Sequence, residues 1–171
     1  MRVASPAPTG WLCGSQGRAV MEDAMSRVST YLNFMGRTEE AVIFYATVFG
    51  TQVHGPIVRM GDMPAAPGVP ELPEVERALV MHVELPILAG HVLMATDMLE
   101  SMGHQLTIGN NITINLEPDT LEEMLRLYNA LSDGGSESTG IQQMPWGNWA
   151  CTLDRFGIRW MFNHAAATST P

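Results

Sequence analysis

The same order of predicted secondary structure occurs twice along this chain of 171 residues. A β-prone run at residues 29–34 precedes an amphipathic helix that ends at Gly50, and three more strands follow. A second run at residues 111–116 precedes a second helix that ends at Gly134, again with three strands after it. Because each half supports the assignment of the other, the sequence predicts two units of strand, helix and three strands in one α+β domain.

The first helix is the clearest element. Thr38 is its predicted N-cap, and Gly50 supplies the left-handed residue that ends it. Its apolar residues recur at helical spacing and define one face, made of Ala41, Phe44, Tyr45, Val48 and Phe49. A strand is expected at residues 51–60, and a long loop at residues 61–76 then precedes two further strands at 77–85 and 91–96.

The second helix has the spacing of a capping box at Asp119 and Glu122. Its expected apolar face consists of Leu121, Met124, Leu125 and Tyr128. The last three strands are expected at residues 138–143, 147–153 and 159–164.

A chain of this length can bury a core without disulfides or metal. We expect one domain at residues 28–165, with a first module at 28–100 and a second at 108–165. Residues 1–27, rich in Pro, Gly, Ser and Ala, are expected to be an irregular extension, and residues 166–171 a tail. One interpretation is that residues 1–24 are translated from an upstream start codon.

Charge and cysteine content exclude several classes of partner. Nine basic against eighteen acidic residues give a net charge of −9, which repels nucleic acid and anionic membranes alike. The two cysteines, Cys13 and Cys151, lack any metal-ligand spacing and fit a reduced compartment. No apolar run approaches the roughly 20 residues that cross a bilayer, and no secretory signal begins the chain. We therefore expect a soluble, cytoplasmic protein.

Four sequence blocks carry a resemblance to a known family. They are YLNFMGRTEEAVIFYATVFG (31–50), ALVMHVELPILAGHVLMATD (78–97), GNNITINLEPDTLEEMLRLYNALSDGG (109–135) and PWGNWACTLDRFGIRWMFN (145–163). Together they resemble the PhnB-like proteins of the vicinal oxygen chelate superfamily, which includes glyoxalases, bleomycin-resistance proteins and dioxygenases. The resemblance implies two βαβββ modules that form curved mixed sheets around a cleft for a small molecule, and a homodimer.

The metal ligands of that superfamily are not kept in this sequence. The resemblance places the ligand positions near Thr30, near Asp97, at Asn111 and near Met161. A hydroxyl, an amide and a thioether are poor ligands for zinc or nickel, and only Asp97 carries charge. We therefore expect no metal site of the superfamily type and no cofactor.

His82 and Asp97 are the candidate catalytic residues. His82 lies in an apolar strand with Glu84 on the same face, and PhnB-like proteins often have His at the matching position. An imidazole beside a carboxylate suits a general base, although a histidine held by structural hydrogen bonds is the alternative. Asp97 ends a strand, where it either orients a ligand and takes a proton or caps the next turn.

Further candidates are ligand contacts that carry no chemistry of their own. Late aromatic residues form either a flat apolar wall for a ligand or part of the core. The expected contacts are Thr30, Asn111, Trp146, Trp149, Met161 and Asn163. The segment DRFG at residues 154–157 resembles the Asp-x-x-Gly hairpin of the superfamily, which is structural.

The sequence leaves two functions open. The first is a PhnB-like protein that binds a small organic molecule in the cleft as a metal-independent enzyme, lyase-like or isomerase-like, or as a degenerate glyoxalase-superfamily member. The second is a non-catalytic protein that sequesters its ligand, of the bleomycin-resistance type. Similar proteins are often labelled 3-demethylubiquinone methyltransferase. We do not expect that activity, because nothing in the sequence resembles a site for S-adenosylmethionine.

Overall fold

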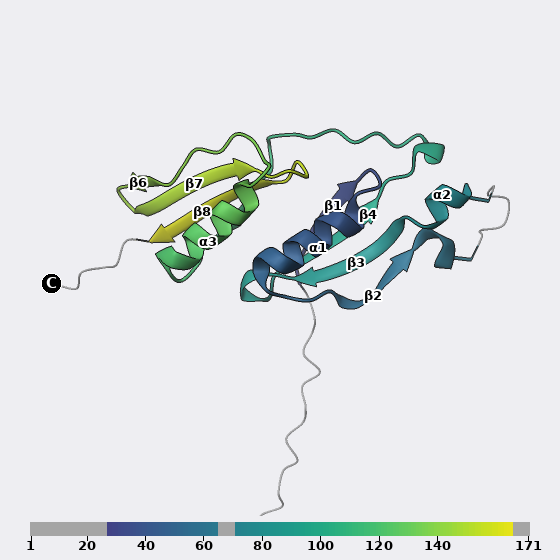
Figure 1. Cartoon of the computed structure of the whole chain (residues 1–171), viewed down its shortest axis with the longest axis horizontal. Helices are drawn as coiled ribbons and strands as arrows, with labels where there is room; N and C mark the ends of the chain where they lie inside the picture. Colours follow the sequence, from purple (N-terminus) through teal and green to yellow (C-terminus); the bar gives the residue numbers. More distant parts are fainter. Residues whose placement is uncertain (1–26, 65–70, 166–171) are drawn as a thin grey trace, which may run out of the picture.

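The computed structural model describes residues 27–64 and 71–165 of the chain. The expected tail and nearly all of the expected N-terminal extension lie outside these residues. Two mixed four-stranded sheets, each with one long helix, make up the described structure (Figure 1). The predicted α+β fold of two βαβββ modules is confirmed.

The first module has strand order β1-β4-β3-β2, in which β1 and β4 are parallel and the other neighbours antiparallel. Its elements are β1 (Thr30–Phe34), α1 (Thr38–Phe49), β2 (His54–Arg59), the 3-10 turn η1 (Met60–Asp62), the short helix α2 (Glu74–Arg77), β3 (Val80–Pro86), the turn η2 (Leu88–Gly90) and β4 (Val92–Asp97).

The second module repeats this topology with the order β5-β8-β7-β6. Its elements are β5 (Ile114–Leu116), α3 (Leu121–Ser132), β6 (Gln142–Met144), β7 (Gly147–Leu153) and β8 (Arg159–Ala165). Residues 98–113, which include the turn η3 (Glu100–Met102), form the linker between the modules.

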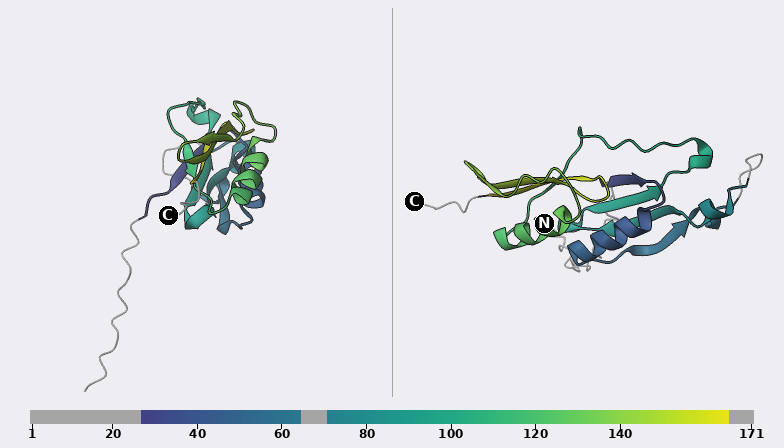
Figure 2. Two further views of the ribbon diagram at one scale, coloured as in Figure 1. Left: turned by 90° about the vertical axis from the view of Figure 1, so that its left-hand side faces the viewer. Right: turned by 45° about the horizontal axis from the view of Figure 1, so that its top comes forward.

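The helices cover one face of the sheets and leave the other face open. Helix α1 packs on β3 and β4, and α3 packs on β7 and β8. Figure 2 shows both helices on one side of the strands and the linker on the opposite side. In β1, Leu32 and Phe34 are buried toward α1, whereas Tyr31 and Asn33 are exposed on the face away from it. We call the face away from the helices the open face.

Aromatic residues join the two modules beneath α1. The Tyr45 ring of α1 packs edge-on against Phe156 and Trp160 of the second module. Asp154 lies among them, 3% exposed, at the start of the predicted DRFG hairpin. Gly157 closes this hairpin with a φ of +84°, in the left-handed region that favours glycine.

Both predicted N-caps were wrong, whereas the predicted C-terminal Gly50 of α1 was correct. The N-cap of α1 is Arg37, and Thr38 is instead the first helical residue, buried against Asp97 of β4. The N-cap of α3 is Thr120, whose hydroxyl accepts from the Glu123 amide. In α3 the observed N-cap therefore lies one residue after the predicted one. In α1 the carboxylate of Asp97, from a distant strand, accepts the hydrogen bond that a local N-cap side chain was expected to accept.

The apolar face predicted for α3 was only half correct. Met124 and Tyr128 are buried, whereas Leu121 and Leu125 are about 40% exposed. Leu127 and Leu131 take their places, because Met124, Leu127, Tyr128 and Leu131 also follow helical spacing and face β7 and β8.

Several predicted strands were too long. Residues 51–53 precede β2, because the Thr51 amide still bonds to Ala46 at the end of α1. Residues 77–79 precede β3, since the turn of α2 extends to Arg77. Residues 111–113 precede β5, and residues 138–141 precede β6. Glu137 just before this last segment and Gly140 within it have left-handed backbones, which interrupt an extended strand.

Candidate functional site

A groove of about 640 Å³ lies between the two modules. Its walls are residues 29–33 at β1, residues 106–114 of the linker and β5, and residues 156–159 leading into β8. Thr30 and Asn111, two of the expected ligand contacts, line this intermodule groove. The Thr30 hydroxyl also hydrogen-bonds to Nε2 of His91 at 3.0 Å.

A row of three polar side chains lies on the open face beside the groove. Tyr31 lines the groove, and a hydrogen bond of 3.2 Å joins its hydroxyl to Nδ1 of His82. Nε2 of His82 is 3.5 Å from Oε1 of Glu84. The structure thus places His82 and Glu84 side by side, as alternation along the strand predicts, and adds Tyr31.

Glu84 is the centre of charge in this row. Arg27 donates to Oε1 at 3.0 Å, and Nδ1 of His54 lies 3.7 Å from Oε2. The hydrogen bond from Arg27, with a smaller contribution from His82, holds the pKa of Glu84 below its usual value. Burial raises the pKa of Tyr31. Near neutral pH, Glu84 is therefore an anion and Tyr31 a neutral hydroxyl.

Asp97 lies on the opposite side of the sheet from His82. It is 4% exposed, and its Oδ1 accepts from the Thr38 amide at 3.1 Å and the Thr38 hydroxyl at 2.7 Å. Oδ2 accepts from the Val80 amide at 2.9 Å. Asp97 thereby caps α1 and fixes the start of β3, a structural role with distant partners and not the cap of the next turn that the sequence suggested. The structure does not bring the two candidate catalytic residues together.

Three of the other expected contacts share the open face of the second sheet. Trp149 lies opposite Asn163 in the pairing of β7 with β8, and Met161 lies two residues before Asn163. The Asn163 amide donates to Oδ1 of Asn115 at 2.7 Å. Trp146, before β7, is 56% exposed. None of these four residues is among those that line the intermodule groove within the described structure.

Sequence reasoning missed Arg159, the first residue of β8. Its side chain is 16% exposed, lines the groove and forms an ion pair with Glu137. The sequence contained a signal that could have identified Arg159. It precedes Met161 and Asn163 at intervals of two residues on one strand, so its side chain lies on the same face as theirs.

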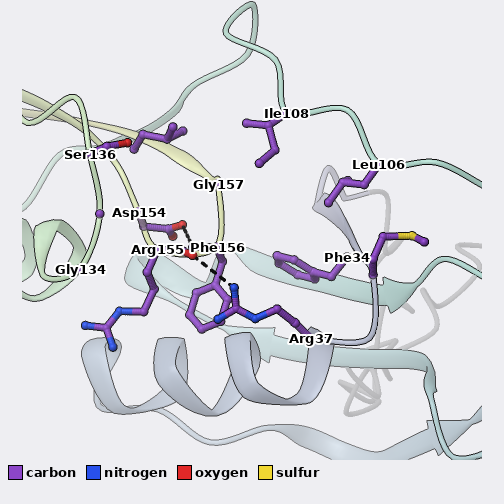
Figure 3. Close-up of a pocket in the computed structure, with 13 residues that line it drawn as sticks. Phe34, Arg37, Leu106, Ile108, Gly134, Ser136, Asp154, Arg155, Phe156 and Gly157 are labelled. Carbon is purple, nitrogen blue, oxygen red and sulfur yellow. Dashed lines mark hydrogen bonds between the residues drawn. The ribbon is translucent and has the colours of Figure 1, made fainter. Parts of the chain in front are cut away.

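A second hollow of about 400 Å³ lies at the hairpin of residues 154–157. Figure 3 shows Arg37 and Arg155 lying over α1 near Phe156, with Leu106 and Ile108 on the far side. Its charged groups are already paired, Arg37 with Glu40 and Arg155 with Asp133. This hollow therefore offers a ligand fewer free polar groups than the intermodule groove.

The superfamily ligand positions do not converge in this chain. Thr30 and Asn111 line the groove, whereas Asp97 is buried under α1 and Met161 lies on the second sheet. Within residues 27–64 and 71–165, no group of three or more His, Cys, Asp and Glu side chains is placed to hold a metal ion. The same described residues contain no helix long and apolar enough to cross a membrane.

Comparisons with known proteins agree with this fold. The family model described as 3-demethylubiquinone-9 3-methyltransferase matches residues 26–162. Protein PA1353 of Pseudomonas aeruginosa is 27% identical with a TM-score of 0.68, over 82% of this chain and 98% of that one. A PhnB protein of Bacillus cereus is 22% identical with a TM-score of 0.63, over 82% and 100%.

A more distant structure has the same fold. The glyoxylase/bleomycin resistance protein/dioxygenase domain of Frankia sp. EAN1pec is 12% identical with a TM-score of 0.56, over 85% of this chain and 96% of that one. Comparison with the curated proteins gave no match. The family match spans most of the chain, and the structural neighbours share both modules. The chain therefore belongs to the family whose model is described as 3-demethylubiquinone-9 3-methyltransferase, and it shares its fold with PhnB and with a glyoxylase/bleomycin resistance protein/dioxygenase domain.

Proposed function

We propose that this protein binds a small, partly apolar organic molecule in the intermodule groove. The observation that carries the proposal is the composition of the groove, which combines apolar side chains with a few polar groups. The linker residues Leu106, Ile108 and Ile112 are 40, 57 and 76% exposed, and all three line the groove. A ligand that covered them would gain apolar burial, while β1 supplies hydroxyl and amide groups to orient it.

The row of Tyr31, His82 and Glu84 supports a metal-independent proton transfer at this groove. Tyr31 is the member that lines the groove, so its hydroxyl can pass a proton from a ligand to His82. The anionic Glu84 then stabilises the imidazolium that forms. In this proposal Asp97 positions α1 and takes no part in the proton transfer.

A second candidate function is sequestration without catalysis. It is favoured by Trp149, Met161 and Asn163, which together present an aromatic ring, a soft apolar side chain and an amide on the open face of the second sheet. Such a surface binds a planar compound without an acid, a base or a metal.

We also propose a homodimer, because Tyr31 on the open face and the linker residue Met102 are exposed and a second copy would cover them. Methyl transfer, named in the family description, is not part of the proposal. No G-x-G-x-x-G turn that would hold a nucleotide cofactor occurs in the sequence.

Binding is tested by titrating the protein with a panel of small aromatic and aliphatic compounds while its tryptophan fluorescence is recorded. Mass spectrometry of the recovered compound then separates the two functions, since an altered compound indicates catalysis and an unaltered one indicates sequestration. If none of the panel binds, the proposed groove function is wrong.

The proton transfer has its own variants. We expect His82→Ala and Tyr31→Phe to abolish turnover of any altered compound. His54→Ala is the matched control, because His54 flanks the same Glu84 carboxylate but is not bonded to Tyr31. Turnover that survives in both His82→Ala and Tyr31→Phe would remove the row from the mechanism.

A further inference from the structure

We infer that the ligand of the intermodule groove carries an oxyanion, a carboxylate or a phosphate, which Arg159 binds. This inference rests on the proposed function, since it specifies the class of molecule that the groove takes. Four observations support it, namely the charge of the groove, the burial of Arg159, its free donor and its pairing with Glu137.

The charge of the groove is opposite to that of the chain. The whole sequence has eighteen acidic against nine basic residues. Among the described residues that line the groove, however, Arg159 is the only one with a charged side chain. The remaining polar lining groups are hydroxyls and amides, such as those of Ser29, Thr107 and Asn111. An anion in the groove therefore meets one cation among the lining residues, and the carboxylate that already pairs with this cation is that of Glu137, outside the lining.

Arg159 is buried further than its hydrogen bonds account for. Its side chain is only 16% exposed, and Nε has no hydrogen-bond partner among the described residues. The other neighbour of the guanidinium besides Glu137 is the Cys151 thiol, a weak acceptor that adds to the rise in the pKa of Arg159 caused mainly by Glu137. A buried donor without a partner is costly, because it has given up water without replacement. An oxyanion in the groove would supply the missing acceptor.

The neighbouring donor of Arg159 is held by Glu137. Nη2 of Arg159 donates to the Glu137 carboxylate, and the Glu137 side chain is 55% exposed. A guanidinium binds an oxyanion side-on through Nε–H and the adjacent Nη–H together. The ligand would therefore use the free Nε and compete with Glu137 for Nη2.

The exposure of Glu137 supports this exchange. Its side chain is 55% exposed, and an ion pair with an exposed partner contributes little net stability, because water can solvate the carboxylate once it leaves. We expect the Glu137 carboxylate to give way when a ligand oxyanion arrives.

The test compares three probes that share a naphthalene ring: 1-naphthoate, 1-naphthyl phosphate and the neutral 1-naphthamide, which has nearly the shape of the naphthoate, each titrated by calorimetry. We expect at least one anion to bind about 10-fold to 100-fold more tightly than the amide, the range that one charge-assisted hydrogen bond gives. The better of the two anions identifies carboxylate or phosphate as the natural group.

Two variants assign the preference to Arg159. Arg159→Gln should remove the preference for the anion while binding of 1-naphthamide persists. Glu137→Gln should strengthen anion binding, because it removes the competing carboxylate and leaves the guanidinium in place. If the ion pair between Arg159 and Glu137 were purely structural, both variants would lower the stability of the protein and neither would change its preference for the anion. Circular dichroism and thermal melts establish that each variant is folded, and Glu137→Gln tests the inference even if Arg159→Gln unfolds.

The outcomes separate this inference from the function on which it rests. If the amide binds as tightly as both anions, Arg159 does not select the ligand, while the proposed groove function survives. If Glu137→Gln weakens anion binding, the competition is wrong and the inference falls. If no probe binds, both the inference and the proposed groove function fail.

Discussion

The hydroxyl of Tyr45 donates a hydrogen bond of 2.7 Å to Oδ2 of Asp154, and both side chains are buried. Tyr45 belongs to α1 of the first module, whereas Asp154 begins the hairpin before β8 of the second. The same carboxylate accepts from the Trp160 indole and from the amides of Phe156 and Ile158. One buried anion with four donors therefore fixes the hairpin and the contact between the modules.

Replacing Tyr45 by Phe should lower the free energy of unfolding by about 1.5–3 kcal/mol, the range for a hydrogen bond to a charged group. Urea denaturation measures the change. Thr47→Ala on the same helix is the control, because Thr47 is exposed and bonds only to the Ile43 carbonyl of its own helix. Equal effects of the two substitutions would contradict a special role for the Tyr45–Asp154 bond.

Tyr45 should also make the protein sensitive to alkali. Burial first, and then the Asp154 charge, raises the pKa of Tyr45 well above its usual value. A group with a raised folded pKa contributes its full stability below its unfolded pKa, about 10 for tyrosine, and loses it as pH rises toward the folded pKa. The unfolding free energy should thus fall above pH 10, and more steeply than in Tyr45→Phe. Parallel slopes in urea titrations from pH 9 to 11 would rule this out.

The fold could be predicted because its evidence is local and repeated. Gly50 ends α1 in the left-handed conformation, as predicted, and β1 and α1 begin within one residue of their expected positions. The caps could not be predicted because they depend on long-range contacts. The carboxylate that caps α1 comes from Asp97, 59 residues further along the chain.

The candidate site could be predicted only where one strand sufficed. His82 and Glu84 are two residues apart on β3, so alternation alone places them on one face. The pairing of His82 with Tyr31 spans 51 residues and depends on the order β1-β4-β3 in the sheet. Arg159 and Asn111 line the same groove only because the linker folds back toward β1. The path of the linker produces no periodic pattern in the sequence, so it could not be predicted.

Asp97→Asn separates the structural role of this residue from a catalytic one. The amide keeps the shape of the carboxylate but replaces one acceptor by a donor, so it cannot accept from both Thr38 and Val80. We expect the free energy of unfolding to fall by about 2–4 kcal/mol. Asp62→Asn is the control, because the Asp62 carboxylate accepts from the Arg59 amide at an exposed site, and this substitution should lower the free energy of unfolding by less. An Asp97→Asn protein of unchanged stability would refute the cap.

Glu76 should contribute stability that is lost in acid. Its hydrogen bonds from the hydroxyl and amide of Ser101 hold its pKa below the usual value. A lowered folded pKa stabilises the protein above the unfolded pKa, about 4.3, and that stability disappears as pH falls through the folded pKa. Glu76→Gln should therefore melt at a lower temperature than wild type at pH 7, and the gap should close near pH 3. A gap that is independent of pH would exclude ionisation of Glu76 as its cause.

Gly135 is required by close approach of the backbone. A Cβ at this position would lie 2.3 Å from the Leu153 carbonyl oxygen, which accepts from the Ser136 amide at 2.7 Å. Neither residues 135–136 nor β7 can move away without breaking that bond, so Gly135→Ala should lower the free energy of unfolding by about 2–3 kcal/mol. Gly140→Ala is the matched control, because its φ is +71° but no atom lies within 4 Å of the added Cβ. That variant should pay only the left-handed backbone cost of about 1–2 kcal/mol. If chemical denaturation gave Gly135→Ala the smaller loss, the contact between residues 135 and 153 would not be as close as the structure has it.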